Sequence, residues 1–146
     1  MLPEPADLLI AEDNPDDLEL TLRALKKNKV VNNIQTVKDG AEALDYLFYR
    51  GRFSNRQAAQ MPKVIFLDLK LPKVDGIEVL RQIKTNERTR AIPVVMLTSS
   101  QLEQDVIESY RLGVNSYIVK PVDFSKFAES ITQIGLYWLS LNQSRR

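Results

Sequence analysis

The chain has 146 residues, of which 44% are apolar, and this is enough for the core of one ordinary domain. Its 20 basic and 19 acidic residues leave a formal net charge of +1, which argues against a strongly basic nucleic-acid binder. Cysteine and histidine are both absent, so the sequence excludes disulfides, zinc–thiolate sites, histidine metal ligands and Ser-His-Asp catalysis.

Five short apolar segments punctuate the chain, and each is followed by a segment with helical spacing. Most of the apolar segments are continuous rather than alternating, which is typical of strands that are covered on both faces of a parallel sheet. The expected strands cover residues 8–11, 34–37, 64–67, 94–97 and 117–119.

Helices are expected after each strand because apolar residues recur there at spacings of three and four. Several helix starts carry N-capping chemistry. The expected caps are Asn14 before Pro15, Asp75, Ser100 in a capping box with Glu103, and Asp123.

The strict alternation of strands and helices predicts an α/β fold with a doubly wound parallel sheet, because βαβ crossovers are right-handed. Two segments differ from what a compact domain of this kind usually has. The polar connection over residues 50–61 is longer than most loops between a helix and a strand. The last helix is expected to continue through the apolar residues 136–139.

No apolar run approaches the ~20 residues that a membrane-spanning helix needs. The acidic, proline-containing start also lacks the basic and apolar regions of a signal peptide. We therefore expect a cytoplasmic protein with neither a membrane nor a nucleic acid as partner.

Chemically useful side chains follow four of the five strands. Ligands of open α/β sheets bind beyond the carboxyl ends of the strands, and these ends carry Glu12, Asp13, Asp68, Thr98 and Lys120. Three neighbouring carboxylates repel one another unless a cation joins them, and Mg²⁺ suits such oxygen ligands. An Asp can attack phosphorus to form an aspartyl phosphate, whose charge Mg²⁺ and Lys120 could neutralise. The sequence therefore predicts a phosphoryl-binding metal site.

This pattern of residues resembles the receiver domain of two-component response regulators, and the segment 68–76 resembles the phosphoacceptor loop of that family. The resemblance covers about residues 6–135. It implies the CheY-like, flavodoxin-like (βα)5 fold, with a five-stranded parallel sheet in the order 2-1-3-4-5. It also implies one receiver domain over residues 1–146.

By this resemblance, Asp68 is the phosphoacceptor, and Mg²⁺ is held by Glu12, Asp13, Asp68 and the backbone carbonyl of Lys70. Thr98 and Lys120 would bind the phosphoryl group. These roles imply self-catalysed phosphotransfer and autodephosphorylation, not an enzyme with a separate substrate.

Tyr117 matches an aromatic switch residue of the family, whose ring turns inward when Thr98 moves. An equally open interpretation is a half-buried aromatic side chain on an edge strand. The resemblance further implies a cis peptide bond between Lys120 and Pro121, although cis bonds are a minority before proline.

A narrower resemblance is to the regulators of cyanobacterial phytochromes, the Rcp group. It rests on the segments 92–100 and 116–124, the connection over 50–61, and Tyr137 with Trp138. It implies a phytochrome histidine kinase as phosphodonor and a homodimer through the fourth helix, the fifth strand and the fifth helix. The extra apolar face of residues 136–139 makes Tyr137 and Trp138 interface candidates. Trp138 could equally cover the core of its own domain.

The expected function is that of a response regulator that signals to a partner protein after Mg²⁺-dependent phosphorylation. A phosphorelay intermediate, which passes the phosphoryl group to a second histidine protein, remains an alternative. A phosphatase of the haloacid dehalogenase type is disfavoured. That class resembles a chain with two Asp residues spaced by one after its first strand, whereas Asn14-Pro15 follows Asp13 here.

Overall fold

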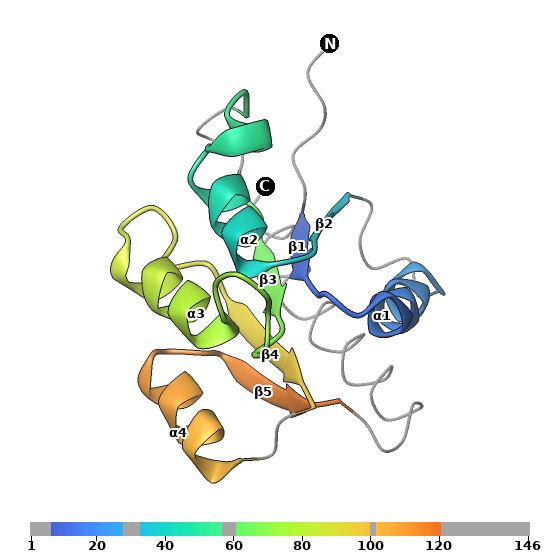
Figure 1. Cartoon of the computed structure of the whole chain (residues 1–146), viewed down its shortest axis with the longest axis vertical. Helices are drawn as coiled ribbons and strands as arrows, with labels where there is room; N and C mark the ends of the chain where they lie inside the picture. The colour runs from blue at the N-terminus through green and yellow to red at the C-terminus, as the bar shows by residue number, and fades with distance from the viewer. Residues whose placement is uncertain (1–6, 28–32, 57–60, 100–101, 121–146) are drawn as a thin grey trace, which may run out of the picture.

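The computed structural model describes residues 7–27, 33–56, 61–99 and 102–120. The described residues form one parallel sheet of five strands in the order β2-β1-β3-β4-β5 (Figure 1). The strands are β1 (Leu8–Ala11), β2 (Ile34–Val37), β3 (Val64–Leu67), β4 (Val94–Thr98) and β5 (Ser116–Val119). The predicted fold class and strand order are confirmed.

Helices cover both faces of the sheet, with α1 on one face and α2 and α3 on the other (Figure 1). The helices are α1 (Pro15–Lys27), α2 (Gly40–Leu47), α3 (Gly76–Thr85) and α4 (Glu103–Arg111), with a short 3-10 helix η1 (Gly51–Phe53). The expected fifth helix, its cap Asp123 and the apolar residues 136–139 lie outside the described residues.

The strands divide their side chains between two core clusters because successive residues of a strand point to opposite faces. On β3, Ile65 and Leu67 pack in the cluster that contains the buried residues of α2 and α3. Val64 and Phe66 pack in the cluster that contains Leu25 of α1. Both faces of the sheet are therefore buried under other side chains, which explains why β1 and β3 are continuous apolar runs.

Two of the predicted helix caps are confirmed. The side-chain oxygen of Asn14 accepts hydrogen bonds from the backbone N–H groups of Asp16 at 2.9 Å and Asp17 at 3.1 Å. Asp75 accepts from the N–H of Glu78 at 3.0 Å. These caps fix where α1 and α3 begin, next to the carboxyl ends of β1 and β3.

The predicted capping box is wrong. Helix α4 begins at Glu103, and Leu102 occupies the N-cap position. A capping box with Ser100 needs Glu103 in the third helical position, where its side chain can reach back to the cap. As the first helical residue, Glu103 cannot take that role.

The long connection after α2 folds back onto that helix in its described part. The guanidinium of Arg56 lies 3.6 Å from the ring centroid of Tyr46 and 4.9 Å from that of Tyr49. It also donates to the backbone carbonyl of Tyr46. Tyr46 in turn meets Phe53 edge to face, with ring centroids 5.0 Å apart. Cation–π and aromatic contacts thus hold this segment in place.

We expect Arg56→Ala to lower the free energy of unfolding by about 1–2 kcal/mol, because it removes two cation–π contacts and a hydrogen bond. Urea denaturation measures this loss. The matched control is Arg88→Ala at an exposed arginine, for which a change below about 0.5 kcal/mol is expected. Equal effects of the two substitutions would contradict a stabilising role for Arg56.

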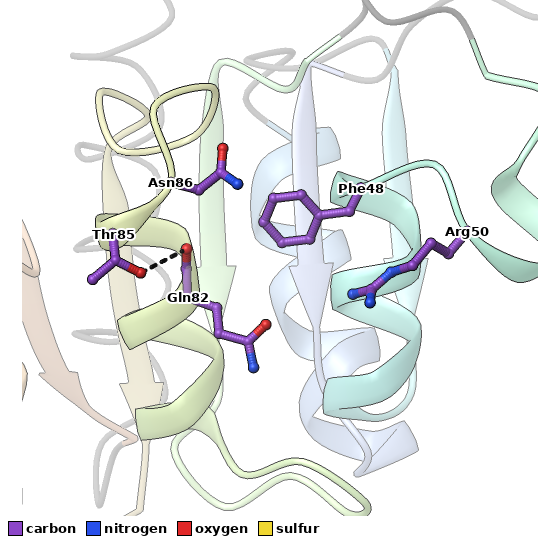
Figure 2. A pocket seen from close by; sticks show the side chains of 5 residues that line it. All are labelled: Phe48, Arg50, Gln82, Thr85 and Asn86. Carbon is purple, nitrogen blue, oxygen red and sulfur yellow. Dashed lines mark hydrogen bonds between the residues drawn. The ribbon is translucent and has the colours of Figure 1, made fainter.

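An open pocket lies between the carboxyl ends of α2 and α3 (Figure 2). It is lined by Phe48, Arg50, Gln82, Thr85 and Asn86. Both helices run antiparallel to the strands, so this pocket lies near the edge at which the strands begin. It is therefore remote from the edge at which Asp68 and the other predicted site residues lie.

None of the helices in the described ranges combines the length and the apolar character that crossing a bilayer requires.

Candidate functional site

The topology places the predicted site residues at one edge of the sheet. Glu12 and Asp13 follow β1, Asp68 follows β3, and Lys120 follows β5. The register pairs Ala11 with Leu67, so the residues after β1 and β3 are direct neighbours. The strand order reverses between β1 and β3, which is where ligands of open α/β sheets bind.

Three carboxylates converge at this edge. One carboxylate oxygen from each of Glu12, Asp13 and Asp68 lies within 4.8 Å of the others. Glu12 and Asp68 are buried, at 5% and 7% exposure, whereas Asp13 is exposed. The cluster is therefore buried on the side of the sheet and open to solvent at Asp13.

The ammonium of Lys120 closes the cluster on its other side. It lies 2.9 Å from Oδ2 of Asp68 and 3.0 Å from Oδ2 of Asp17, and it donates a third hydrogen bond to Oε1 of Glu12. A protonated lysine has three N–H donors, and these three carboxylates match that number. The side chain of Lys120 is only 8% exposed, so it is held at the site.

Backbone groups hold the same carboxylates from the opposite direction. The N–H of Lys70 donates to Oδ1 of Asp68 at 3.2 Å, and the N–H of Asn14 donates to Oε2 of Glu12 at 3.2 Å. The N–H of Gly76 donates to the carbonyl of Leu69 at 2.7 Å, which closes the loop after β3. Glu12 and Asp68 are thus each oriented through both carboxylate oxygens.

Burial and charge shift the proton affinities of this site. Burial and, to a smaller extent, the neighbouring Asp68 raise the pKa of Glu12 to about 7, although Lys120 opposes the rise. Burial alone would lower the pKa of Lys120, but its bonds to Glu12 and Asp68 outweigh burial and raise that pKa. Lys120 therefore remains a cation over the whole physiological range.

The donor set fits a hard divalent cation. All the clustered side chains offer carboxylate oxygens, which are the ligands that Mg²⁺ prefers in proteins. One ammonium faces several carboxylates, so the ionised site retains negative charge that a divalent cation can neutralise. The open position at Asp13 leaves room for water and a phosphate oxygen, as Mg²⁺ sites usually require.

Asp17 is a site residue that sequence reasoning missed. In the first turn of α1, an acid ordinarily serves to place negative charge at the positive end of the helix. In the structure its carboxylate also contacts Lys120. The available signal was its place in the first helical turn after Glu12-Asp13, which brings it to the same edge of the sheet.

Thr98 and Tyr117 lie on the neighbouring strands β4 and β5. Thr98 is the last residue of β4 and pairs with Val119 of β5, so it lies at the same edge as Asp68. Tyr117 lies on the edge strand of the described sheet, is half-buried, and packs against the core. The half-buried interpretation of Tyr117 is confirmed, and its switch role stays a prediction.

Three further predictions fall on residues outside the described ranges. They are the cis bond from Lys120 to Pro121 and the interface roles of Tyr137 and Trp138.

Comparisons with known proteins agree with this geometry. Residues 8–132 match the family model of the response regulator receiver domain. The probable methanogenesis regulatory protein FilR2 of Methanothrix harundinacea is 42% identical over 141 residues, which cover 97% of this chain and 88% of that protein.

Two solved structures of regulators are also similar. The crystal structure of the phosphorylated cyanobacterial phytochrome response regulator RcpA has a TM-score of 0.84 and 39% identity, covering 94% of this chain and 96% of RcpA. The Mn²⁺-bound form of response regulator Rcp1, a protein of Synechocystis, has a TM-score of 0.83 and 38% identity, covering 92% and 95%. The resemblance to the Rcp group is thereby confirmed.

Proposed function

Since this chain belongs to the response regulator receiver family, we propose that it accepts a phosphoryl group on Asp68 from a sensor histidine kinase. Receiver domains are signalling domains and not enzymes with a separate substrate. The observation that supports Asp68 is the placement of its buried carboxylate within the open acidic cluster, in contact with Lys120.

In the proposed reaction, a carboxylate oxygen of Asp68 attacks the phosphorus atom of a phosphohistidine. The phosphorus–nitrogen bond breaks, and its electron pair returns to the imidazole nitrogen. Lys120 lies 2.9 Å from Asp68 and can donate to a phosphoryl oxygen, as can the hydroxyl of Thr98. The ammonium of Lys120 would neutralise part of the negative charge on the phosphoryl group. The hydroxyl of Thr98 would donate a hydrogen bond to that group.

We propose that Glu12, Asp13, Asp68 and the backbone carbonyl of Lys70 hold Mg²⁺. When bound, this ion supplies positive charge against the phosphoryl oxygens and against the repulsion between carboxylates. Support comes from the convergence of the three carboxylates and from the Mn²⁺-bound form of the similar regulator Rcp1.

For the output, we propose that phosphorylation shifts the population toward a state in which Thr98 and Tyr117 have moved. Tyr117 pairs with Met96 of β4, the strand that ends at Thr98. Strand β4 also lies next to β3, which Asp68 follows. A movement at Thr98 can therefore reach Tyr117. Large apolar side chains are exposed near this strand: Ile107 and Tyr110 of α4 are 56% and 52% exposed. Such exposure supports a protein partner on this face.

The partners are proposals that the relatives support. RcpA is described as a phytochrome response regulator, so we propose a phytochrome histidine kinase as phosphodonor. We also propose that residues 1–146 act as one receiver domain and that two copies associate, with Tyr137 and Trp138 as interface candidates. Phosphotransfer from a purified phytochrome kinase, compared with an unrelated histidine kinase, tests the choice of donor.

The first experiment is intact-mass measurement after incubation with acetyl phosphate and Mg²⁺. We expect the wild type to gain the mass of one phosphoryl group and Asp68→Asn to gain none, because the amide cannot attack phosphorus. The matched control is Asp16→Asn, an exposed acid that we expect to leave phosphorylation intact.

Chelation of divalent cations with EDTA during this reaction is expected to abolish the adduct. An adduct of equal extent on Asp68→Asn would place the acceptor elsewhere and overturn the assignment.

A further inference from the structure

Lys120 is bound by carboxylates from two kinds of element. Glu12 and Asp68 follow strands, and both belong to the group of three clustered carboxylates. Asp17 lies in the first turn of α1 and does not belong to that group, yet its Oδ2 is 3.0 Å from the ammonium. Asp17 is thus a partner of the lysine that stands apart from the candidate metal ligands.

The backbone of Asp17 is held firmly. Its N–H donates to the side chain of Asn14 at 3.1 Å, and its carbonyl accepts from the hydroxyl of Thr21 at 3.1 Å. Its side chain is 35% exposed, whereas those of its two competitors for the ammonium are at most 10% exposed. Asp17 is therefore a fixed anion at the outer side of the site.

Divalent cation binding changes what Lys120 can contact. Oxygens of Glu12 and Asp68 that bind the cation become less available to the ammonium, because both cations compete for the same lone pairs. The charge-assisted bond to Asp17 does not take part in this competition. The ammonium therefore keeps Asp17 as a partner when Glu12 and Asp68 bind the divalent cation, and it does not have to leave the site.

From this arrangement, and resting on the function proposed above, we propose that Asp17 is a positioning residue for Lys120. It draws the ammonium toward α1, so that Glu12 and Asp68 can exchange it for a divalent cation while Lys120 stays beside the phosphoacceptor. Without Asp17, the ammonium concentrates on Glu12 and Asp68 and competes more strongly with the divalent cation.

The test is the affinity for Mg²⁺, measured by calorimetry on the unphosphorylated protein. We expect Asp17→Asn to weaken Mg²⁺ binding roughly five-fold, because the site loses one negative charge and the ammonium shifts toward the ligands. The control is Asp16→Asn, the neighbouring acid of the same helical turn, which is exposed. Its effect should stay below roughly two-fold because solvent screens it. Asp17→Glu, which keeps the charge, should recover most of the affinity.

A double-mutant cycle separates positioning from a general effect of charge. In a Lys120→Met background there is no ammonium to position, so Asp17→Asn should lower Mg²⁺ affinity clearly less than it does in the wild type. An equal effect of Asp17→Asn in both backgrounds would overturn the proposal, and so would unchanged affinity in the single variant.

A second measurement needs neither Mg²⁺ nor a substitution of Lys120. NMR gives the rate at which the ammonium protons of Lys120 exchange with water. We expect this rate to rise several-fold in Asp17→Asn and to stay unchanged in Asp16→Asn, because a hydrogen-bonded proton exchanges slowly. An unchanged rate in Asp17→Asn would count against the proposal. Neither readout uses phosphorylation, so failure of Asp68 as acceptor would be seen separately.

Discussion

Substitution of Lys120 by Met is expected to lower the free energy of unfolding of the metal-free protein by about 3 kcal/mol at pH 8. The substitution removes the ammonium that bonds to Glu12, Asp17 and Asp68. It leaves Glu12 and Asp68 buried next to each other with no cation between them. Removal of one partner from a buried charge cluster costs more than the cluster contributes, because the remaining charges are desolvated without compensation.

The loss depends on pH through Glu12. The pKa of Glu12 is about 7 in the folded protein and 4.5 as an ordinary glutamate, and loss of Lys120 raises the folded pKa further. An acid whose pKa is raised by folding destabilises the fold only when it is ionised. Stability is therefore retained below about pH 4.5 and lost as the pH rises through the folded pKa. We expect a smaller loss at pH 5 than at pH 8.

Urea denaturation at both pH values, with EDTA or with Mg²⁺, measures these effects. Addition of Mg²⁺ at pH 8 should restore more stability to Lys120→Met than it adds to the wild type, because it supplies the missing positive charge. Lys63→Met is the control, since Lys63 makes a partly exposed ion pair with Asp7 at 3.6 Å. Its loss should stay below about 1 kcal/mol. A loss for Lys120→Met that is equal at both pH values would contradict the role of Glu12.

The second large effect is expected at Gly76, where the loop after β3 meets the start of α3. A Cβ atom at this position would lie 2.2 Å from the carbonyl oxygen of Asp68 and 2.7 Å from Cα of Leu69. Both atoms belong to the backbone, so they can yield only if the loop moves. We expect Gly76→Ala to lower the free energy of unfolding by at least about 2 kcal/mol.

The same clash is expected to displace the phosphoacceptor site, because the backbone segment that must move carries Asp68. We therefore expect phosphorylation by acetyl phosphate to slow at least roughly ten-fold in the folded variant, since a misplacement of about 1 Å can cost 10²-fold in rate. Intact mass against time measures this rate, and circular dichroism confirms that the variant is folded.

Gly113→Ala separates displacement of the site from general loss of stability. Gly113 follows α4 and has φ +100, a backbone conformation that side chains rarely adopt, so Ala is strained there. The atoms nearest to its Cβ would belong to the flexible side chain of Lys84, at 3.6–3.8 Å, which is ordinary contact. We expect reduced stability with an unchanged phosphorylation rate. Equal slowing in both variants would contradict the link from Gly76 to Asp68.

Local patterns were sufficient to predict the strands. The runs Leu8–Ala11 and Val64–Leu67 are continuous and apolar because helices cover both faces of the sheet, and they were found at their observed bounds. Asn14 and Asp75 were predicted as helix caps because their side chains bond to the next turn, which is a contact between sequence neighbours.

Helix starts were predicted less well than strands. Ser100 and Glu103 have the spacing of a capping box, but α4 begins at Glu103 instead. Asp39 is a cap that was not predicted: it accepts from the N–H of Glu42 at 2.7 Å at the start of α2. Spacing alone therefore does not fix the first residue of a helix.

The sequence by itself determined the fold class, the strand order through its family resemblance, and the set Glu12, Asp13, Asp68 and Lys120, because the carboxyl ends of parallel strands always meet at one edge. Only the tertiary structure decided how these charges are paired. Lys120 binds Asp17, which is 103 positions away in the chain. Such a contact depends on how α1 and β5 are placed around the sheet, and no periodicity or spacing encodes that distance.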